Sequence, residues 1–66
     1  MKVTVKMARV GADLSQAEMA KQMGMSYVTY LAKEKNPASM TIKEACNFCK
    51  IVGADFDDIF FDTNSN

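Results

Sequence analysis

The chain has 66 residues, of which 48% are hydrophobic and 24% charged, and its formal net charge is zero. That length allows one small domain with a single modest core. The chain has no histidine and two cysteines, which excludes a zinc site with four protein ligands from one chain. No run approaches the roughly 20 apolar residues of a membrane helix, and no signal-peptide pattern opens the chain. The sequence therefore predicts a cytoplasmic protein with no membrane segment.

The charges are divided unevenly along the chain. Residues 1–36 hold six basic and three acidic side chains, a formal charge of +3, whereas residues 37–66 hold two and five, a formal charge of −3. A net charge of zero is unusual for a nucleic-acid-binding protein, because lysine and arginine neutralise the phosphates. The separation can still orient a basic end of the domain toward DNA.

The first predicted helix has Thr4 as its N-cap and runs to about Gly11. The Val-Thr-Val run at 3–5 has strand propensity, but we expect no strand there because a single strand would have no partner. Residues 13–14 form the link to the next helix.

The second predicted helix runs from about Gln16 to Met23. Ser15 and Glu18 have the spacing of a capping box, in which each side chain satisfies a backbone N–H at the helix start. Gly24 follows where a helix end needs a residue that tolerates positive φ. Two short helices joined this tightly predict a helix-turn-helix.

The third predicted helix runs from about Tyr27 to Lys35, with Ser26 as its cap. Asn36 must end it, because the residue before a proline avoids the helical region.

Thr41 and Glu44 form a second capping box, which predicts a fourth helix ending at Val52 before Gly53. Asp55 is expected to cap a short fifth helix, which buries three apolar side chains: Phe56, Ile59 and Phe60. The predicted fold is therefore an all-α, five-helix orthogonal bundle with a central helix-turn-helix, formed by residues 1–62. Residues 63–66 are expected to be a disordered polar tail.

From Thr4 to Phe61 the chain resembles the helix-turn-helix family of lambdoid phage repressors and Cro proteins, the Xre/Cro-like family. The residues that carry the resemblance are Arg9, Leu14 to Ala20, Gly24 to Ser26, Thr29, Glu34, Pro37 and Gly53 to Phe60. The resemblance implies a lambda repressor-like fold and a sequence-specific DNA-binding transcriptional regulator, such as a small phage, prophage or mobile-element repressor. Its third helix would enter the major groove of a double-stranded operator, with two copies on a two-fold site.

The resemblance also implies the contacts. Gln16 would contact a phosphate, since the start of a helix carries free N–H groups and positive dipole character. Lys35 and Asn36 could contact phosphates as well, or simply end their helix at the surface. The full predicted DNA-binding set is Gln16, Ser26, Tyr27, Val28, Thr29, Ala32, Lys35 and Asn36.

The predicted outer face of the third helix is unusually apolar for base reading. Its residues, Tyr27, Val28, Leu31 and Ala32, offer few hydrogen bonds to base edges. Tyr27 is the main polar group, and Val28 suits a thymine methyl. Such a patch also suits a protein partner, so the alternative is an interaction module that modulates a larger repressor. A merely structural patch is the third interpretation.

Arg9 and Glu34 match positions that the family commonly joins, and the resemblance therefore implies a bidentate bridge between the first and third helices. The alternative is that Arg9 is a surface charge or a phosphate contact. Cys46 and Cys49 form a C-x-x-C, which we interpret as two small buried apolar residues and not as a metal or redox site. Met19, Met23 and Met25 are expected to fill the core. With no histidine and no glycine-rich phosphate loop, we predict neither an enzyme nor a cofactor.

Overall fold

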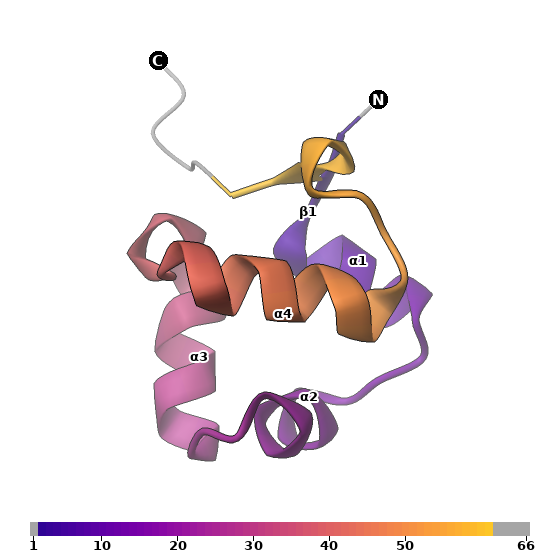
Figure 1. Ribbon diagram of the computed structural model, residues 1–66. Helices are drawn as coiled ribbons and strands as arrows, with labels where there is room; N and C mark the ends of the chain where they lie inside the picture. Colours follow the sequence, from indigo (N-terminus) through magenta and orange to yellow (C-terminus); the bar gives the residue numbers. More distant parts are fainter. Residues whose placement is uncertain (1, 62–66) are drawn as a thin grey trace.

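The structure is a computed structural model that describes residues 2–61 and is mostly helical (Figure 1). The α-helices are α1 (Val5–Gly11), α2 (Gln16–Met23), α3 (Tyr27–Lys35) and α4 (Ile42–Val52). The structure also has two 3-10 turns, η1 (Pro37–Ser39) and η2 (Phe56–Asp58). It has two short strands, β1 (Val3–Thr4) and β2 (Ile59–Phe60). The all-α prediction is confirmed, but the bundle has four α-helices within residues 2–61 and not five. The predicted disordered tail at 63–66 lies outside the described residues.

Local hydrogen bonds at the helix ends account for the agreement between the predicted and observed limits. The Thr4 hydroxyl accepts a hydrogen bond from the Met7 N–H, which caps α1. Reciprocal capping boxes open α2 at Ser15 and α4 at Thr41. Gly24 and Gly53 end these same two helices at φ values of 72° and 73°, in the left-handed region that favours glycine.

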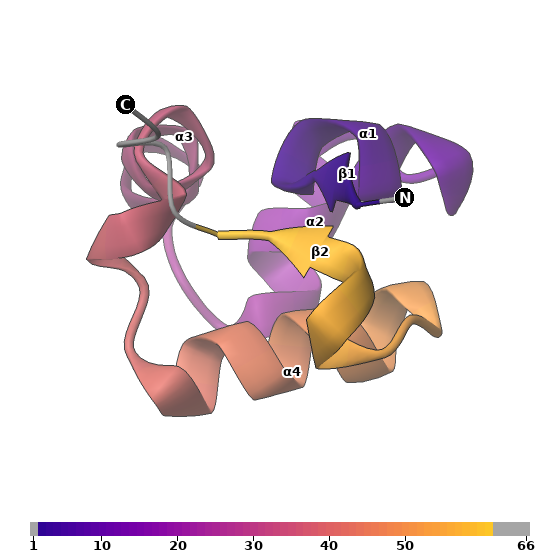
Figure 2. The same ribbon diagram turned by 90° about the horizontal axis from the view of Figure 1, so that it is seen from above.

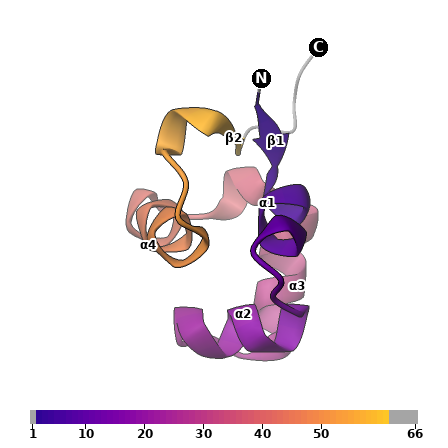
Figure 3. The same cartoon turned by 90° about the vertical axis from the view of Figure 1, so that its right-hand side faces the viewer.

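The helices enclose one small core. α2 lies at the N-terminal end of α3, whereas α4 joins the other end of α3 through η1 (Figure 1). Views from above and from the side show α1 and α4 as separate layers with α2 beneath them (Figures 2 and 3). All four α-helices and β2 contribute side chains to this core: Val5, Met19, Ala20, Tyr30, Phe48, Cys49 and Ile59.

The predicted fifth helix is wrong. Residues 56–58 form one 3-10 turn, and Asp55 makes no side-chain cap to it. Ile59 then adopts an extended conformation, with φ −115° and ψ 133°. Ile59 is buried as expected, whereas Phe56 is 44% exposed, and the side chain of Phe60 is not among those described.

The expectation that residues 3–5 have no strand partner is also wrong in part. β1 pairs in parallel with β2, in the register Val3 with Ile59 and Thr4 with Phe60. The two ends of the described chain thus meet, and this pairing takes the place of a last helical turn. The sequence does not reveal this partner, because it lies more than 50 residues away in a segment whose pattern predicts a helix.

The link between α1 and α2 turns at Asp13, which has a φ of 61°. Aspartate tolerates this left-handed conformation better than most non-glycine residues, because its short polar side chain can bond locally. The turn reverses the chain within the predicted link. Among residues 2–61, no helix is both long and apolar enough to cross a membrane.

Candidate nucleic-acid interface

The carboxylate of Glu34, in the last turn of α3, joins three helices. Arg9 Nε donates to Glu34 Oε2 at 2.7 Å, and Arg9 Nη2 lies 3.4 Å from Glu34 Oε1. The Tyr30 hydroxyl donates to Oε2 at 2.6 Å, one helical turn away on α3. Gln16 Nε2 donates to Oε1 at 2.8 Å from the first turn of α2. The predicted Arg9–Glu34 bridge is therefore confirmed, and it belongs to a larger network.

This network is shielded from water. The Arg9 and Glu34 side chains are 8% and 6% exposed, and Tyr30 is fully buried. Burial alone would raise the Glu34 pKa, but hydrogen bonds from Arg9, Tyr30 and Gln16 together hold that pKa below its usual range. The hydrogen bond to Glu34 raises the pKa of Arg9. Burial, with the hydrogen bond to Glu34, raises the pKa of the Tyr30 hydroxyl. Glu34 is thus ionised at neutral pH.

Arg9 also secures the link that precedes α2. Its Nη1 donates to the carbonyl oxygen of Leu14 at 2.7 Å. One guanidinium therefore binds both the end of α3 and the segment that leads into α2, which fixes where α2 begins. An arginine at this site suits the task, because its planar fork presents several donors in fixed directions.

Gln16 is less accessible than its predicted role as a phosphate contact assumed. Its side chain is half-buried, and one amide N–H is directed to Glu34. The amide retains a second N–H and its carbonyl oxygen. The hydrogen bond to Glu34 was missed because 18 residues separate the two positions and no local sequence pattern links them.

The first two turns of α3 leave apolar and small polar groups at the surface. Val28 is 73% and Tyr27 48% exposed, and Thr29 and Ala32 are exposed as well. Leu31, which was expected to face outward, is half-buried. The exposed face of α3 therefore includes Tyr27, Val28 and Ala32 but only part of Leu31.

Two of the predicted contact residues have a structural role at the start of α3. Ser26 Oγ accepts a hydrogen bond from the Thr29 backbone N–H at 3.2 Å and donates to Thr29 Oγ1 at 2.8 Å. Both side chains are exposed, so this cap lies at the surface beside Tyr27. The arrangement fixes the orientation of the first turn of α3.

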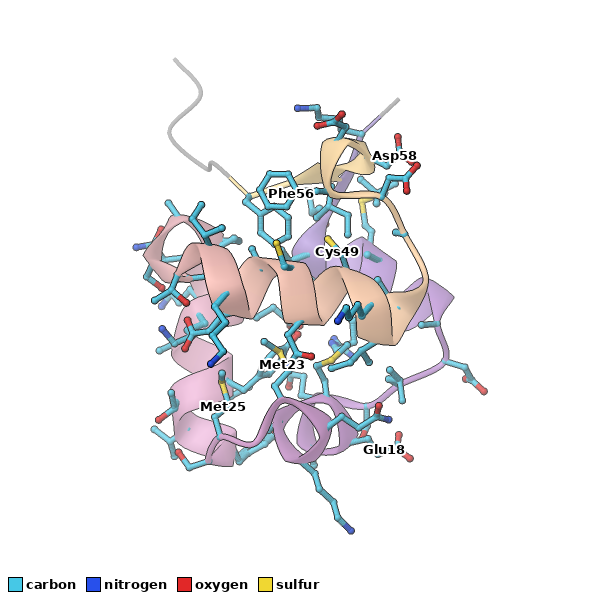
Figure 4. All side chains as sticks on the ribbon, in the orientation of Figure 1. Glu18, Met23, Met25, Cys49, Phe56 and Asp58 are labelled. Atoms are coloured by element: carbon cyan, nitrogen blue, oxygen red, sulfur yellow. The ribbon has the colours of Figure 1, made fainter. Side chains whose placement is uncertain are left out.

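Basic side chains gather at the other end of α3. Lys33 Nζ lies 3.0 Å from Glu44 Oε1 and donates to the Ser39 carbonyl at 3.3 Å, so it ties α3 to the start of α4. Lys35 and Asn36, the two predicted phosphate contacts, are exposed. The acidic η2 turn lies at the opposite end of the molecule from α2, where Figure 4 labels Asp58. The structure thus keeps the acidic turn away from the α2–α3 connection.

The sulfur-containing residues divide between core and surface. Met19 is fully buried, and Met23 and Met25 pack between α2, α3 and α4 as expected (Figure 4). Cys49 is buried, and this burial raises its pKa. Cys46 is exposed, so the prediction that both cysteines are buried is wrong for this one. Among residues 2–61, no three cysteine or carboxylate side chains are grouped to hold a metal ion.

Comparisons with protein-family models, with curated proteins and with solved structures find no match to this chain. The geometry of α2, α3 and the Glu34 network is therefore the basis on which a function can be argued.

Proposed function

We propose that the protein is a sequence-specific DNA-binding transcriptional regulator of the phage repressor or Cro type. In this proposal α2, residues 24–26 and α3 act as a helix-turn-helix, and α3 enters the major groove. The observation that carries the proposal is the two-sided character of α3. Tyr30 and Glu34 fix its inner side in a buried network, while Tyr27 and Val28 project from its outer side.

The dimensions of α3 suit a groove. An α-helix with its side chains is about 10–12 Å in diameter, and the major groove of B-DNA is about 12 Å wide. The first turn of α3 is the part that reaches the base edges in this kind of docking. Tyr27 and Val28 occupy that turn, with a hydroxyl that can donate or accept and a branched side chain that suits a thymine methyl.

Contacts with the DNA backbone would come from residues on either side of α3. Gln16 can offer its remaining amide N–H to a phosphate at the start of α2, with the free backbone N–H groups beside it. Lys35 and Asn36 are exposed near the other end of α3. Because the acidic η2 turn lies at the opposite end of the molecule from α2, the field of the domain favours this orientation. Such a regulator acts in the cytoplasm and needs no cofactor.

A second function has a specific observation in its favour. Val28 and Tyr27 are both exposed, and α3 itself contains no glutamine, asparagine or arginine for bidentate base reading. A second regulator protein could bind this pair, in which case the domain would modulate a larger repressor and not read DNA itself.

A salt series of binding measurements separates the two functions. Fluorescent duplexes from the genomic neighbourhood of the gene are titrated with the protein, and scrambled duplexes of equal length serve as controls. A DNA-reading regulator prefers one duplex, and its affinity falls steeply as salt rises because counterions are released from the phosphates. Absence of binding at low salt would reject the regulator and favour the interaction module.

A further inference from the structure

Most hydrogen-bonding side chains of α3 are already bound within the protein. At the start of the helix, Ser26 Oγ donates to Thr29 Oγ1 at 2.8 Å, which leaves Thr29 a single hydroxyl hydrogen. Lys33 Nζ is held 3.0 Å from Glu44 Oε1 at the start of α4. The tyrosine and glutamate of the inner side belong to the buried Glu34 network. Few groups of α3 are therefore left to form hydrogen bonds with base edges.

The outermost strip of α3 carries Val28, Ala32 and Lys35. These positions follow one another at intervals of four and three residues, so they lie on one side of the helix. All three are exposed, and the side chain of Val28 is 73% accessible. Lys35 stands at the C-terminal end of the strip, where the proposed function gives it a phosphate. Toward the first turn, which reaches the bases, the strip presents only methyl groups.

The chemistry of this strip restricts what it can recognise. The apolar group that a standard base pair presents in the major groove is the 5-methyl of thymine. Val28 and Ala32 have no side-chain donor or acceptor, so contact with that methyl is their means of telling bases apart. The nearby Tyr27 hydroxyl either donates or accepts a hydrogen bond. It can therefore bind the O4 acceptor of thymine or the N4 donor of cytosine.

We propose that α3 recognises DNA through the 5-methyl groups of pyrimidines, so that 5-methylcytosine can replace thymine where Val28 and Ala32 make contact. Methylated cytosine carries its methyl at the same ring position as thymine. The two bases differ at position 4, which Val28 and Ala32 cannot read and which the Tyr27 hydroxyl accepts in either form. The ligand is thus double-stranded DNA with C5-methylated pyrimidines in its half-site. This inference rests on the proposed function, because it requires α3 to lie in the major groove.

Changes in the DNA alone test this inference. Selection from a pool of random-sequence duplexes first identifies the sequence that the full chain prefers. That duplex is then made with deoxyuridine in place of individual thymines, which removes the methyl and keeps the hydrogen-bonding edge. Competition titrations should show a loss of about fourfold in affinity for each contacted methyl, the value for burying one such group. The salt dependence should stay unchanged, because no phosphate contact is altered.

The same position then tests the exchange of bases. A C·G pair placed at a contacted T·A pair should bind about fourfold more tightly once its cytosine is methylated at C5. Methylation of cytosines outside the half-sites is the control and should have no effect. A gain at the contacted position would show that the methyl is recognised on either pyrimidine.

Protein variants assign the contact to α3. In Val28→Ala the loss caused by deoxyuridine should shrink at one thymine position, because the side chain that touches the methyl is shortened. Val10→Ala is the matched control, since Val10 is 58% exposed on α1 and lies outside the residues assigned to DNA. This variant should keep the full loss. Lys35→Ala should weaken the thymine and deoxyuridine duplexes by the same factor, as expected for a phosphate contact.

The outcomes separate this inference from the proposed function. A preferred duplex whose affinity no deoxyuridine substitution changes would overturn the inference and leave the DNA-binding regulator standing. A selected half-site without thymine would also overturn it, as would a deoxyuridine loss that Val28→Ala leaves unchanged at every position. Failure to bind any duplex at low salt would reject the proposed function, and the inference with it.

Discussion

Gln16 Nε2 donates a 2.8 Å hydrogen bond to Glu34 Oε1, and this bond joins the first residue of α2 to the last turn of α3. The same carboxylate receives Arg9 and Tyr30, so one side chain determines how three helices meet. A ligand that contacts Gln16 would therefore bind a side chain that Glu34 of α3 holds in place. The predictions begin with this carboxylate.

Glu34→Ala is expected to lower the free energy of unfolding by about 3 kcal/mol. It leaves the buried Arg9 guanidinium without its counter-charge and removes the acceptor of the Tyr30 hydroxyl. Urea denaturation followed by far-UV circular dichroism measures the change. Lys33→Ala is the control, because it removes an ion pair that is 19% and 29% exposed, and its effect should stay below about 1 kcal/mol. Equal effects for the two variants would contradict this ranking.

The Glu34 network also predicts how stability depends on pH. The Glu34 pKa is lowered in the folded state by hydrogen bonds that outweigh the opposing effect of burial. Its stabilising contribution is therefore present above the ordinary glutamate pKa of 4.5 and is lost as the pH falls through the lower folded value. The difference in stability between the wild type and Glu34→Gln should shrink over that acidic range, when both are measured by denaturation from pH 7 downward. A constant difference would mean that Glu34 titrates alike in the folded and unfolded chains.

The sequence allowed the helix limits to be predicted because their signals are local. The capping box of Ser15 and Glu18 and the left-handed Gly24 lie within a few residues of the ends that they define. The Arg9–Glu34 bridge was expected only from a family resemblance, since its partners lie 25 residues apart. The bond from Gln16 to Glu34 has no sequence signal of its own.

The C-terminal segment shows why a cap signal can mislead. Asp55 resembles an N-cap, but only three residues of 3-10 helix follow it. Ile59 instead pairs with Val3, and this contact depends on the three-dimensional arrangement of the whole chain. The exposure of Cys46 has a different cause, because Cys46 lies on a strip of α4 that faces solvent, beside the strip with Cys49 that faces the core. At residues 55–60, long-range pairing outweighed local helix propensity.

Alanine substitutions at two glycines should have effects of opposite sign. Gly53→Ala is expected to destabilise the fold by about 1 kcal/mol, because φ is 73° there even though a Cβ would meet no atom within 4 Å. Gly11→Ala should stabilise it by up to about 0.5–1 kcal/mol, since Gly11 ends α1 without positive φ and has equal space. Thermal midpoints provide the comparison. A loss of stability at both sites would contradict the assignment of the difference to backbone conformation.

The proposed DNA contacts predict different effects for α2 and α3. Gln16→Ala should weaken binding to all duplexes by a similar factor, because phosphate contacts carry no base identity. Val28→Ala should instead erode the preference for the cognate duplex, by about 1–3 kcal/mol if a base contact is lost, while leaving stability unchanged at a side chain that is 73% exposed. Competition titrations with cognate and scrambled duplexes measure both effects. Because Gln16 also binds Glu34, Gln16→Ala can lower the stability of the fold as well as the affinity for DNA. A denaturation curve is therefore measured for this variant, to show that it is folded at the temperature of the binding assay. If Val28→Ala retains full DNA preference but abolishes association with a second regulator protein, the outer face of α3 is a protein interface.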